Sequence, residues 1–88
     1  MYTVIFGIAG CPTCKRAKEI AERLKNERDD FDFKYVDVQK DNVSKRDIEK
    51  SAGKKIESIP QIFIDEHYLG DFNAFEQFAK KELGLYST

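Results

Sequence analysis

The sequence predicts a small α/β fold whose elements follow in the order β-α-β-α-β-β-α. Three observations lead to this prediction. A nearly continuous apolar run fills residues 2–6, as in a strand that is covered on both faces. Apolar residues recur with helical spacing in residues 12–28 and 73–84. Residues 31–38 alternate between apolar and polar side chains, which is the period of a strand.

The first strand, Tyr2 to Phe6, leads through a glycine-containing turn into a helix from Pro12 to about Arg28. If Cys11 is the N-cap, Pro12 takes the first helical position, where its missing N–H is no loss. The face of this helix that is expected to meet the core consists of Ala17, Ile20, Ala21 and Leu24.

A second strand and a short second helix follow. The alternation in residues 31–38 predicts the strand, and strand, helix and strand over this span imply a right-handed crossover with parallel pairing. Ser44 resembles an N-cap, with Asp47 three residues further on. Gly53 is the predicted left-handed cap at the end of this helix.

An antiparallel hairpin and a third helix complete the predicted fold. Strands over residues 61–65 and 67–69 are joined by a short turn. Asn73 is the predicted N-cap of the last helix, with Glu76 as its partner in a capping box. The helix ends at Gly84, and its apolar face consists of Phe72, Phe75, Phe78, Ala79 and Leu83.

Length and composition are those of a single domain over residues 1–88, with 41% hydrophobic residues and seven phenylalanines to form a core. The net charge of −1 argues against nucleic acid or an anionic membrane as the main partner. The sequence has no run of transmembrane length and no signal-peptide pattern. We therefore expect a cytoplasmic monomer whose two cysteines are kept in a reducing environment.

Two cysteines separated by two residues, on a helix that follows a strand, are typical of a thiol–disulfide redox pair. The Cys11 thiol would face the unpaired N–H groups and the positive end of the helix dipole, which favour the thiolate. Lys15, Arg16 and Lys18 follow within two turns and add to that bias. Cys14 lies one turn further into the helix. The sequence therefore predicts Cys11 as the nucleophile and Cys14 as the thiol that resolves its mixed disulfide.

Two other interpretations of the cysteine pair are weaker. A purely structural disulfide would close a loop that is too short to constrain the unfolded chain much. A structural zinc site needs four ligands, and beyond the cysteines the chain offers only His67 and carboxylates, so no metal site is predicted. His67 itself is interpreted as an exposed hairpin residue, because thiol exchange depends on a low thiolate pKa more than on a general base.

The motif Cys11-Pro12-Thr13-Cys14 is typical of the thioredoxin superfamily as a whole. Its combination with Tyr35-Val36-Asp37, with Ser58-Ile59-Pro60-Gln61-Ile62-Phe63 and with a length of 88 residues is more specific. Together these features resemble the small bacterial dithiol glutaredoxins of the enterobacterial type. The resemblance implies a thioredoxin fold, with a four-stranded mixed sheet flanked by three helices.

The resemblance also implies a glutathione site beside Cys11. Pro60 would be cis, and the backbone of Ile59 would pair with the cysteinyl group of glutathione like one rung of a sheet. Thr13 and Gln61 would line the same groove. The remaining residues predicted to bind glutathione are Ser58, Phe72, Asn73 and Ala74. Glutathione is then a co-substrate, and no tightly bound cofactor is expected.

Two departures from the family bear on glutathione. Thr13 replaces the usual Tyr between the cysteines. Ala74 stands where the family has the Asp that holds the γ-glutamyl amine. The Ala74 backbone N–H is still a candidate for the γ-glutamyl carboxylate, and Asp71 or Asn73 for the amine.

The predicted function is a glutathione-dependent oxidoreductase that reduces protein disulfides and glutathione mixed disulfides, with ribonucleotide reductase as the favoured client. The alternative is a carrier reduced directly by thioredoxin reductase, which Thr13 and the altered segment 70–74 motivate. A glutathione-ligated iron–sulfur carrier is disfavoured, because a proline after the first cysteine is associated with poor cluster assembly in the family.

Overall fold

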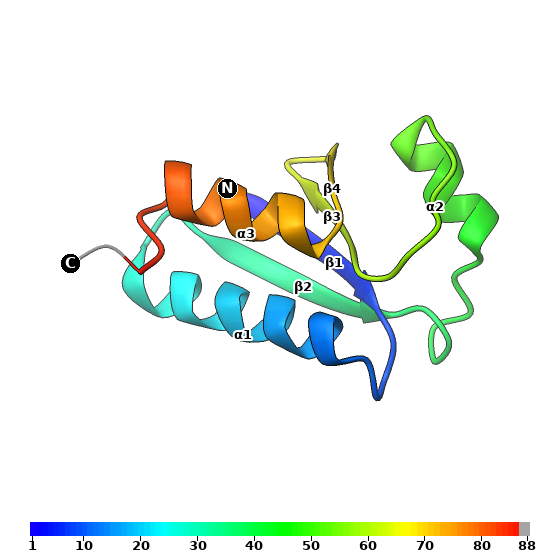
Figure 1. Cartoon of the computed structure of the whole chain (residues 1–88), viewed down its shortest axis with the longest axis horizontal. Coiled ribbons are helices and arrows are strands. Elements are labelled where there is room, and N and C mark those ends of the chain that lie inside the picture. The colour runs from blue at the N-terminus through cyan, green and yellow to red at the C-terminus, as the bar shows by residue number, and fades with distance from the viewer. Residues whose placement is uncertain (87–88) are drawn as a thin grey trace.

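The computed structural model describes residues 1–86, and in that part of the chain it has three helices and four strands (Figure 1). In chain order, the elements are β1 (Tyr2–Gly7), α1 (Pro12–Glu27), β2 (Asp32–Asp37), α2 (Lys45–Ala52), β3 (Gln61–Ile64), β4 (His67–Gly70) and α3 (Phe72–Glu82). The predicted order of elements is confirmed, and each predicted boundary lies within a few residues of the observed one.

The four strands form one mixed sheet in the order β2-β1-β3-β4. β1 and β2 are parallel, whereas β3 is antiparallel to both β1 and β4. Asp65 and Glu66 form the turn between β3 and β4, with positive φ angles of 48° and 70°. This is the handedness that the twist of a two-residue hairpin requires. The predicted parallel pairing of β1 and β2, the predicted hairpin, and the mixed sheet implied by the resemblance are therefore confirmed.

Helices α1 and α3 cover one face of the sheet, and α2 packs on the other. Successive residues of β1 point to opposite faces, so the strand contributes to the core on both sides. Ile5 belongs to a cluster with the apolar faces of α1 and α3, which lie side by side in Figure 1. Val4 and Phe6 pack against a second, smaller cluster formed by Ile48 of α2, Ile56 and Phe63. The larger cluster contains Ala17, Ile20, Ala21 and Leu24, so it fixes α1 against the sheet and thereby positions the cysteines at the start of that helix.

Local capping explains where the later helices begin. Ser44 and Asp47 form the predicted capping box at the start of α2, and Gly53 ends that helix with a φ of 75°. The prediction for α3 is wrong by two residues, because Asp71 and not Asn73 is the N-cap. The Asp71 carboxylate accepts the Ala74 N–H at 3.0 Å, which leaves Asn73 inside the first turn.

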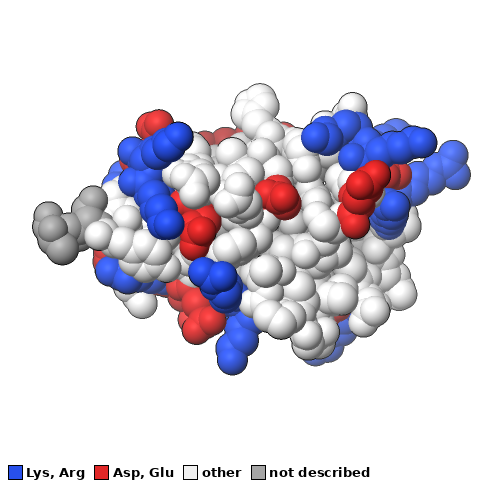
Figure 2. Space-filling model, in the orientation of Figure 1, with Lys and Arg blue, Asp and Glu red and all other residues white. Residues whose placement is uncertain are grey.

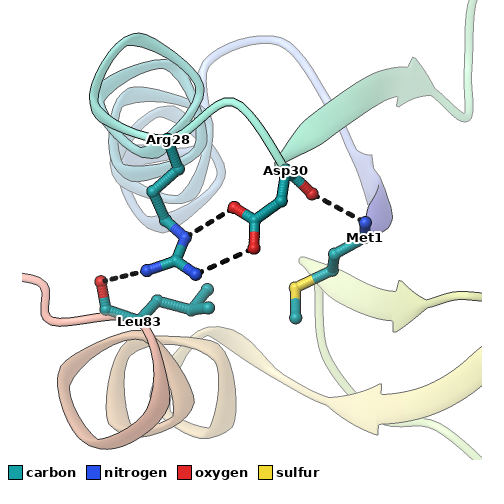
Figure 3. Close-up of polar contacts among 4 residues, drawn as sticks. All are labelled: Met1, Arg28, Asp30 and Leu83. Carbon is teal, nitrogen blue, oxygen red and sulfur yellow. Dashed lines mark hydrogen bonds and ion pairs between the residues drawn. The ribbon is translucent and has the colours of Figure 1, made fainter.

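A set of polar contacts ties the N-terminus to the ends of α1 and α3 (Figure 3). The Arg28 guanidinium donates two hydrogen bonds of 2.9 Å to the Asp30 carboxylate, and it also reaches the Leu83 carbonyl oxygen at 3.5 Å. The Met1 amino group donates to the Asp30 carbonyl oxygen at 2.7 Å. The end of the sheet away from the cysteines is held together in this way.

Candidate redox site

Cys11 is the N-cap of α1, as predicted. Its backbone is extended (φ −95°, ψ 115°), and its Sγ accepts a hydrogen bond from the Cys14 N–H at 3.2 Å. Pro12 opens the helix, and the first turn contains no acidic residue. The unpaired N–H groups and the positive end of the helix therefore face the Cys11 sulfur, which favours its thiolate over its thiol.

The two cysteines differ sharply in exposure. Their sulfur atoms are in disulfide contact, and their Cα atoms are 5.2 Å apart, within the range found for disulfides. Cys14 is fully buried, whereas Cys11 is partly exposed. Of the two sulfur atoms, a substrate can therefore reach that of Cys11, which supports the predicted division of roles.

A groove of about 280 Å³ brings together residues from three separate segments beside Cys11. Thr13 stands on one side, and its hydroxyl is 3.5 Å from Cys11 Sγ. The bond between Ile59 and Pro60 is cis, as the resemblance implied. The residues that line the groove are Thr13, Ser58, Ile59, Pro60, Asp71, Phe72 and Asn73. Six of the eight predicted binding residues thus meet in one place.

The other two predicted binding residues, Gln61 and Ala74, line a neighbouring cavity of about 510 Å³ that shares Ser58 and Asp71 with the groove. The Gln61 side chain is buried, where it donates to the Ser58 carbonyl oxygen at 2.8 Å and accepts from the Tyr68 hydroxyl. The Ala74 N–H, considered above as a carboxylate ligand, already donates to Asp71. Both groups are therefore engaged within the protein.

The predicted thiolate-stabilising cations have different positions. Lys15 and Lys18 line a further cavity of about 290 Å³, which includes Cys11. Arg16 instead points to α3, where it pairs with Glu76 at 3.3 Å and lies 4.7 Å from the centre of the Phe72 ring. In the orientation of Figure 1, basic side chains gather over α2, while the surface beside the start of α1 is largely uncharged (Figure 2).

Sequence reasoning assigned no role to Tyr35 or Gly7, which lie directly behind the cysteines. A methyl group on Gly7 would overlap the Tyr35 hydroxyl and lie 3.0 Å from Cys14 Sγ. Tyr35 donates to the Ile8 carbonyl oxygen at 3.3 Å, and its pKa is raised by burial and by the nearby charge of Asp37. A glycine after an apolar strand is the only signal in the sequence for this close approach.

His67 is exposed on β4, as predicted. Among residues 1–86 there is no group of three or more histidine, cysteine, aspartate or glutamate side chains that could hold a metal ion. None of the three helices described for this chain is long and apolar enough to cross a membrane.

Comparison with known proteins agrees with this geometry. The glutaredoxin family model matches residues 3–69. Glutaredoxin 1 of Salmonella typhimurium is 49% identical over 87 residues, which cover 99% of this chain and 100% of that protein. The glutaredoxin of Vibrio cholerae is 54% identical over 86 residues, or 98% of this chain and 99% of its own length.

Solved structures give the same result. The NMR structure of reduced Escherichia coli glutaredoxin matches with a TM-score of 0.89 and 48% identity, over 96% of this chain and 99% of that chain. The NMR structure of the oxidised E. coli protein matches with a TM-score of 0.87 over the same shares. The chain therefore belongs to the glutaredoxin family, whose members are thiol–disulfide oxidoreductases, and it carries the redox-active cysteine pair of that family.

Proposed function

We propose that the protein is a glutathione-dependent thiol–disulfide oxidoreductase in which Cys11 is the nucleophile and Cys14 the resolving thiol. One observation carries this proposal. The partly exposed Cys11 sulfur caps a helix N-terminus beside a groove that holds Thr13, Ile59 and Phe72, while Cys14 is buried behind it. Such a site offers an activated thiolate, room for one half of a substrate disulfide, and a second thiol within reach.

The reaction follows from these positions. The Cys11 thiolate attacks one sulfur of a substrate disulfide, so a mixed disulfide forms and the other substrate half leaves as a thiolate. The Cys14 thiol loses its proton and attacks Cys11 Sγ, which forms the Cys11–Cys14 disulfide and releases the second substrate thiolate. Two glutathione molecules then reduce this disulfide and are themselves oxidised to glutathione disulfide. Glutaredoxin potentials of about −200 to −230 mV lie near the cytosolic glutathione poise, so the cycle can run.

The backbone beside Pro60 supports the glutathione assignment. Ile59 precedes β3 and takes no part in its ladder, and no partner among residues 1–86 takes its N–H or C=O. Ile59 lines the groove next to Thr13. An extended cysteinyl group in the groove would therefore find a donor and an acceptor, as in strand addition at a sheet edge.

The test is NADPH oxidation, coupled through glutathione and glutathione reductase to reduction of a small glutathione mixed disulfide. We expect a rate well above that of the uncatalysed exchange. A rate equal to the uncatalysed one would remove the glutathione assignment. We also propose that ribonucleotide reductase is a client of the protein, and the same assay with the disulfide of that enzyme as substrate tests this.

A second candidate function rests on the segment that begins α3. Because the Ala74 N–H is occupied by Asp71, this site offers the γ-glutamyl carboxylate one donor fewer than an uncapped helix N-terminus would. A carrier reduced directly by thioredoxin reductase would not need that donor. Turnover with NADPH and thioredoxin reductase in the absence of glutathione would favour this candidate, and no turnover would exclude it.

We further propose that the protein acts as a cytoplasmic monomer of one domain that needs no tightly bound cofactor. The fold supports the one-domain part of this proposal, because all four strands described in residues 1–86 form one sheet and the three helices pack on it. Sedimentation of the reduced protein tests the monomer, and a colourless product after anaerobic iron–sulfur reconstitution would argue against cluster binding.

A further inference from the structure

The buried position of Cys14 raises a chemical problem for the resolving step, if Cys14 has the role proposed above. A thiol must become a thiolate before it attacks a disulfide. Cys14 is 0% exposed, so its sulfur has no water to stabilise a negative charge. Burial in apolar surroundings raises the pKa of a thiol, which would slow the step. The resolving thiolate therefore needs a hydrogen-bond donor from the protein.

The close approach at Gly7 supplies one. Gly7 is the last residue of β1, and the Tyr35 side chain extends from the neighbouring strand β2. A methyl group at Gly7 would contact both the Tyr35 hydroxyl and Cys14 Sγ, so these two atoms lie around the same small space. The absence of a side chain at Gly7 is thus what allows the hydroxyl to lie this near the buried sulfur.

The hydrogen bond that the Tyr35 hydroxyl makes in this structure is weak. Tyr35 donates to the Ile8 carbonyl oxygen at 3.3 Å, whereas hydrogen bonds between oxygen atoms are usually 2.7–2.8 Å long. A thiolate is a stronger acceptor than a carbonyl oxygen, because hydrogen bonds to charged groups are stronger than neutral ones. In the disulfide form the hydroxyl donates to Ile8, and ionisation of the Cys14 sulfur would make that sulfur the stronger of the two nearby acceptors.

We propose that Tyr35 is a positioning residue for the resolving cysteine, and that its hydroxyl donates a hydrogen bond to the Cys14 thiolate. The attack is otherwise unchanged. The bond between Cys14 Sγ and Cys11 Sγ forms, the bond from Cys11 Sγ to the substrate sulfur breaks, and the substrate leaves with the electron pair as a thiolate. Tyr35 keeps its own proton throughout.

The charged groups around Tyr35 are consistent with a neutral donor. The cavity beside its ring is lined by Lys15 and Lys18 of α1 and by Asp37 of β2, and Lys18 Nζ lies 5.5 Å from the ring centre. Burial and the charge of Asp37 raise the pKa of Tyr35 above that of a free tyrosine. The hydroxyl therefore remains protonated throughout the range in which a cytoplasmic enzyme works.

The test is the reaction of the reduced protein with a symmetrical nitrobenzoate disulfide, each half of which is coloured once it is released. Attack by Cys11 releases the first half in a bimolecular phase, and attack by Cys14 releases the second in a phase independent of concentration. We expect Tyr35→Phe to leave the first phase unchanged and to slow the second roughly tenfold at pH 7, since a hydrogen bond to a charged group has about that effect on an ionisation. Tyr2→Phe makes the same chemical change at an exposed position of β1 and should alter neither phase.

A second measurement separates the hydrogen bond from a general loss of packing. In the Cys11→Ser background, the pKa of Cys14 follows from the pH dependence of its Cβ carbon-13 shift. Tyr35→Phe should raise the pKa of Cys14. Gly7→Ala should raise it too, because the added methyl group keeps the tyrosine but pushes its hydroxyl away from the sulfur. An unchanged second phase or an unchanged Cys14 pKa in Tyr35→Phe would overturn the inference. A native protein that shows no second phase would overturn the role of Cys14 itself.

Discussion

The Cys14 amide donates a hydrogen bond to Cys11 Sγ at 3.2 Å, so the first cysteine of the redox pair is also the N-cap of α1. One sulfur atom therefore has both a structural and a chemical function. Because it accepts an N–H that would otherwise be unpaired, the same contact that starts the helix also stabilises negative charge on the nucleophile.

This double function can be separated by substitution of Cys11. Serine is a good N-cap, so Cys11→Ser should keep the stability of the protein while all thiol activity is lost. Cys11→Ala also loses all activity, and it should in addition lower the free energy of unfolding by about 1 kcal/mol. Urea unfolding of the two reduced variants measures the difference. Equal stabilities would mean that the cap contributes little.

Substitution of Cys14 should separate the activity on glutathione mixed disulfides from the activity on protein disulfides. Cys14→Ser leaves the partly exposed thiolate of Cys11, so reduction of glutathione mixed disulfides should continue. Reduction of protein disulfides, which needs both thiols, should stop. The coupled NADPH assay with each substrate measures this. If Cys11→Ser and Cys14→Ser lose the same activities, the assignment of nucleophile and resolving thiol is wrong.

Asp71 offers a test of the altered glutathione segment. Asp71→Asn keeps a capping side chain, so the stability should hardly change, whereas Asp71→Ala should cost about 1 kcal/mol. If the carboxylate binds the γ-glutamyl amine, both variants should raise the KM for glutathione mixed disulfides severalfold, because a charged hydrogen bond is lost in each. An unchanged KM in Asp71→Asn would restrict Asp71 to its role as a cap.

The junction of β4 and α3 depends on Gly70. Its φ is +143°, and a methyl group there would lie 2.8 Å from the Ala74 side chain. Gly70→Ala should therefore destabilise the protein by about 1–3 kcal/mol and also raise the KM, because the start of α3 lines the groove. Gly53→Ala is the matched control, since Gly53 also has positive φ (+75°) but has open space around it. It should destabilise the protein and leave the KM unchanged.

The parts of the fold that follow from local interactions were predictable from the sequence. Ser44, Cys11 and Gly53 act on residues within one helical turn, so their patterns show directly in the chain. The choice between Asp71 and Asn73 did not follow in this way, because both residues are good caps and only the end of β4 decides between them.

Two side-chain contacts between distant elements could not be predicted from the residue pattern. Arg16 was predicted to stabilise the thiolate, and the packing of α1 on α3 places Glu76, 60 residues away in sequence, beside its guanidinium. The approach of Tyr35 to Cys14 depends on the register that sets β2 beside β1 and on the packing of α1 over both. Neither relation leaves a periodic or spaced pattern in the chain.

The contact between Arg28 and Asp30 predicts a dependence of stability on pH (Figure 3). Hydrogen bonds from the guanidinium lower the pKa of Asp30 in the folded state. A group whose pKa is lower when folded stabilises the protein above its unfolded pKa, which is about 3.9 for aspartate, and this contribution is lost as the pH falls through the folded value. Asp30→Asn removes it, so the variant should be the less stable protein at pH 6 and should approach the native stability near pH 2.

Urea unfolding followed by circular dichroism between these pH values measures the effect, and added salt should reduce it because the pair is exposed. Asp29→Asn is the control, since Asp29 is exposed and forms no ion pair with the residues that the structure describes. Its stability should run parallel to that of the native protein at every pH. If the stability of Asp30→Asn also follows that of the native protein at every pH, the Arg28–Asp30 ion pair is too well solvated to stabilise the fold. The contacts of Met1 with Asp30 and of Arg28 with Leu83 then hold this end of the sheet together.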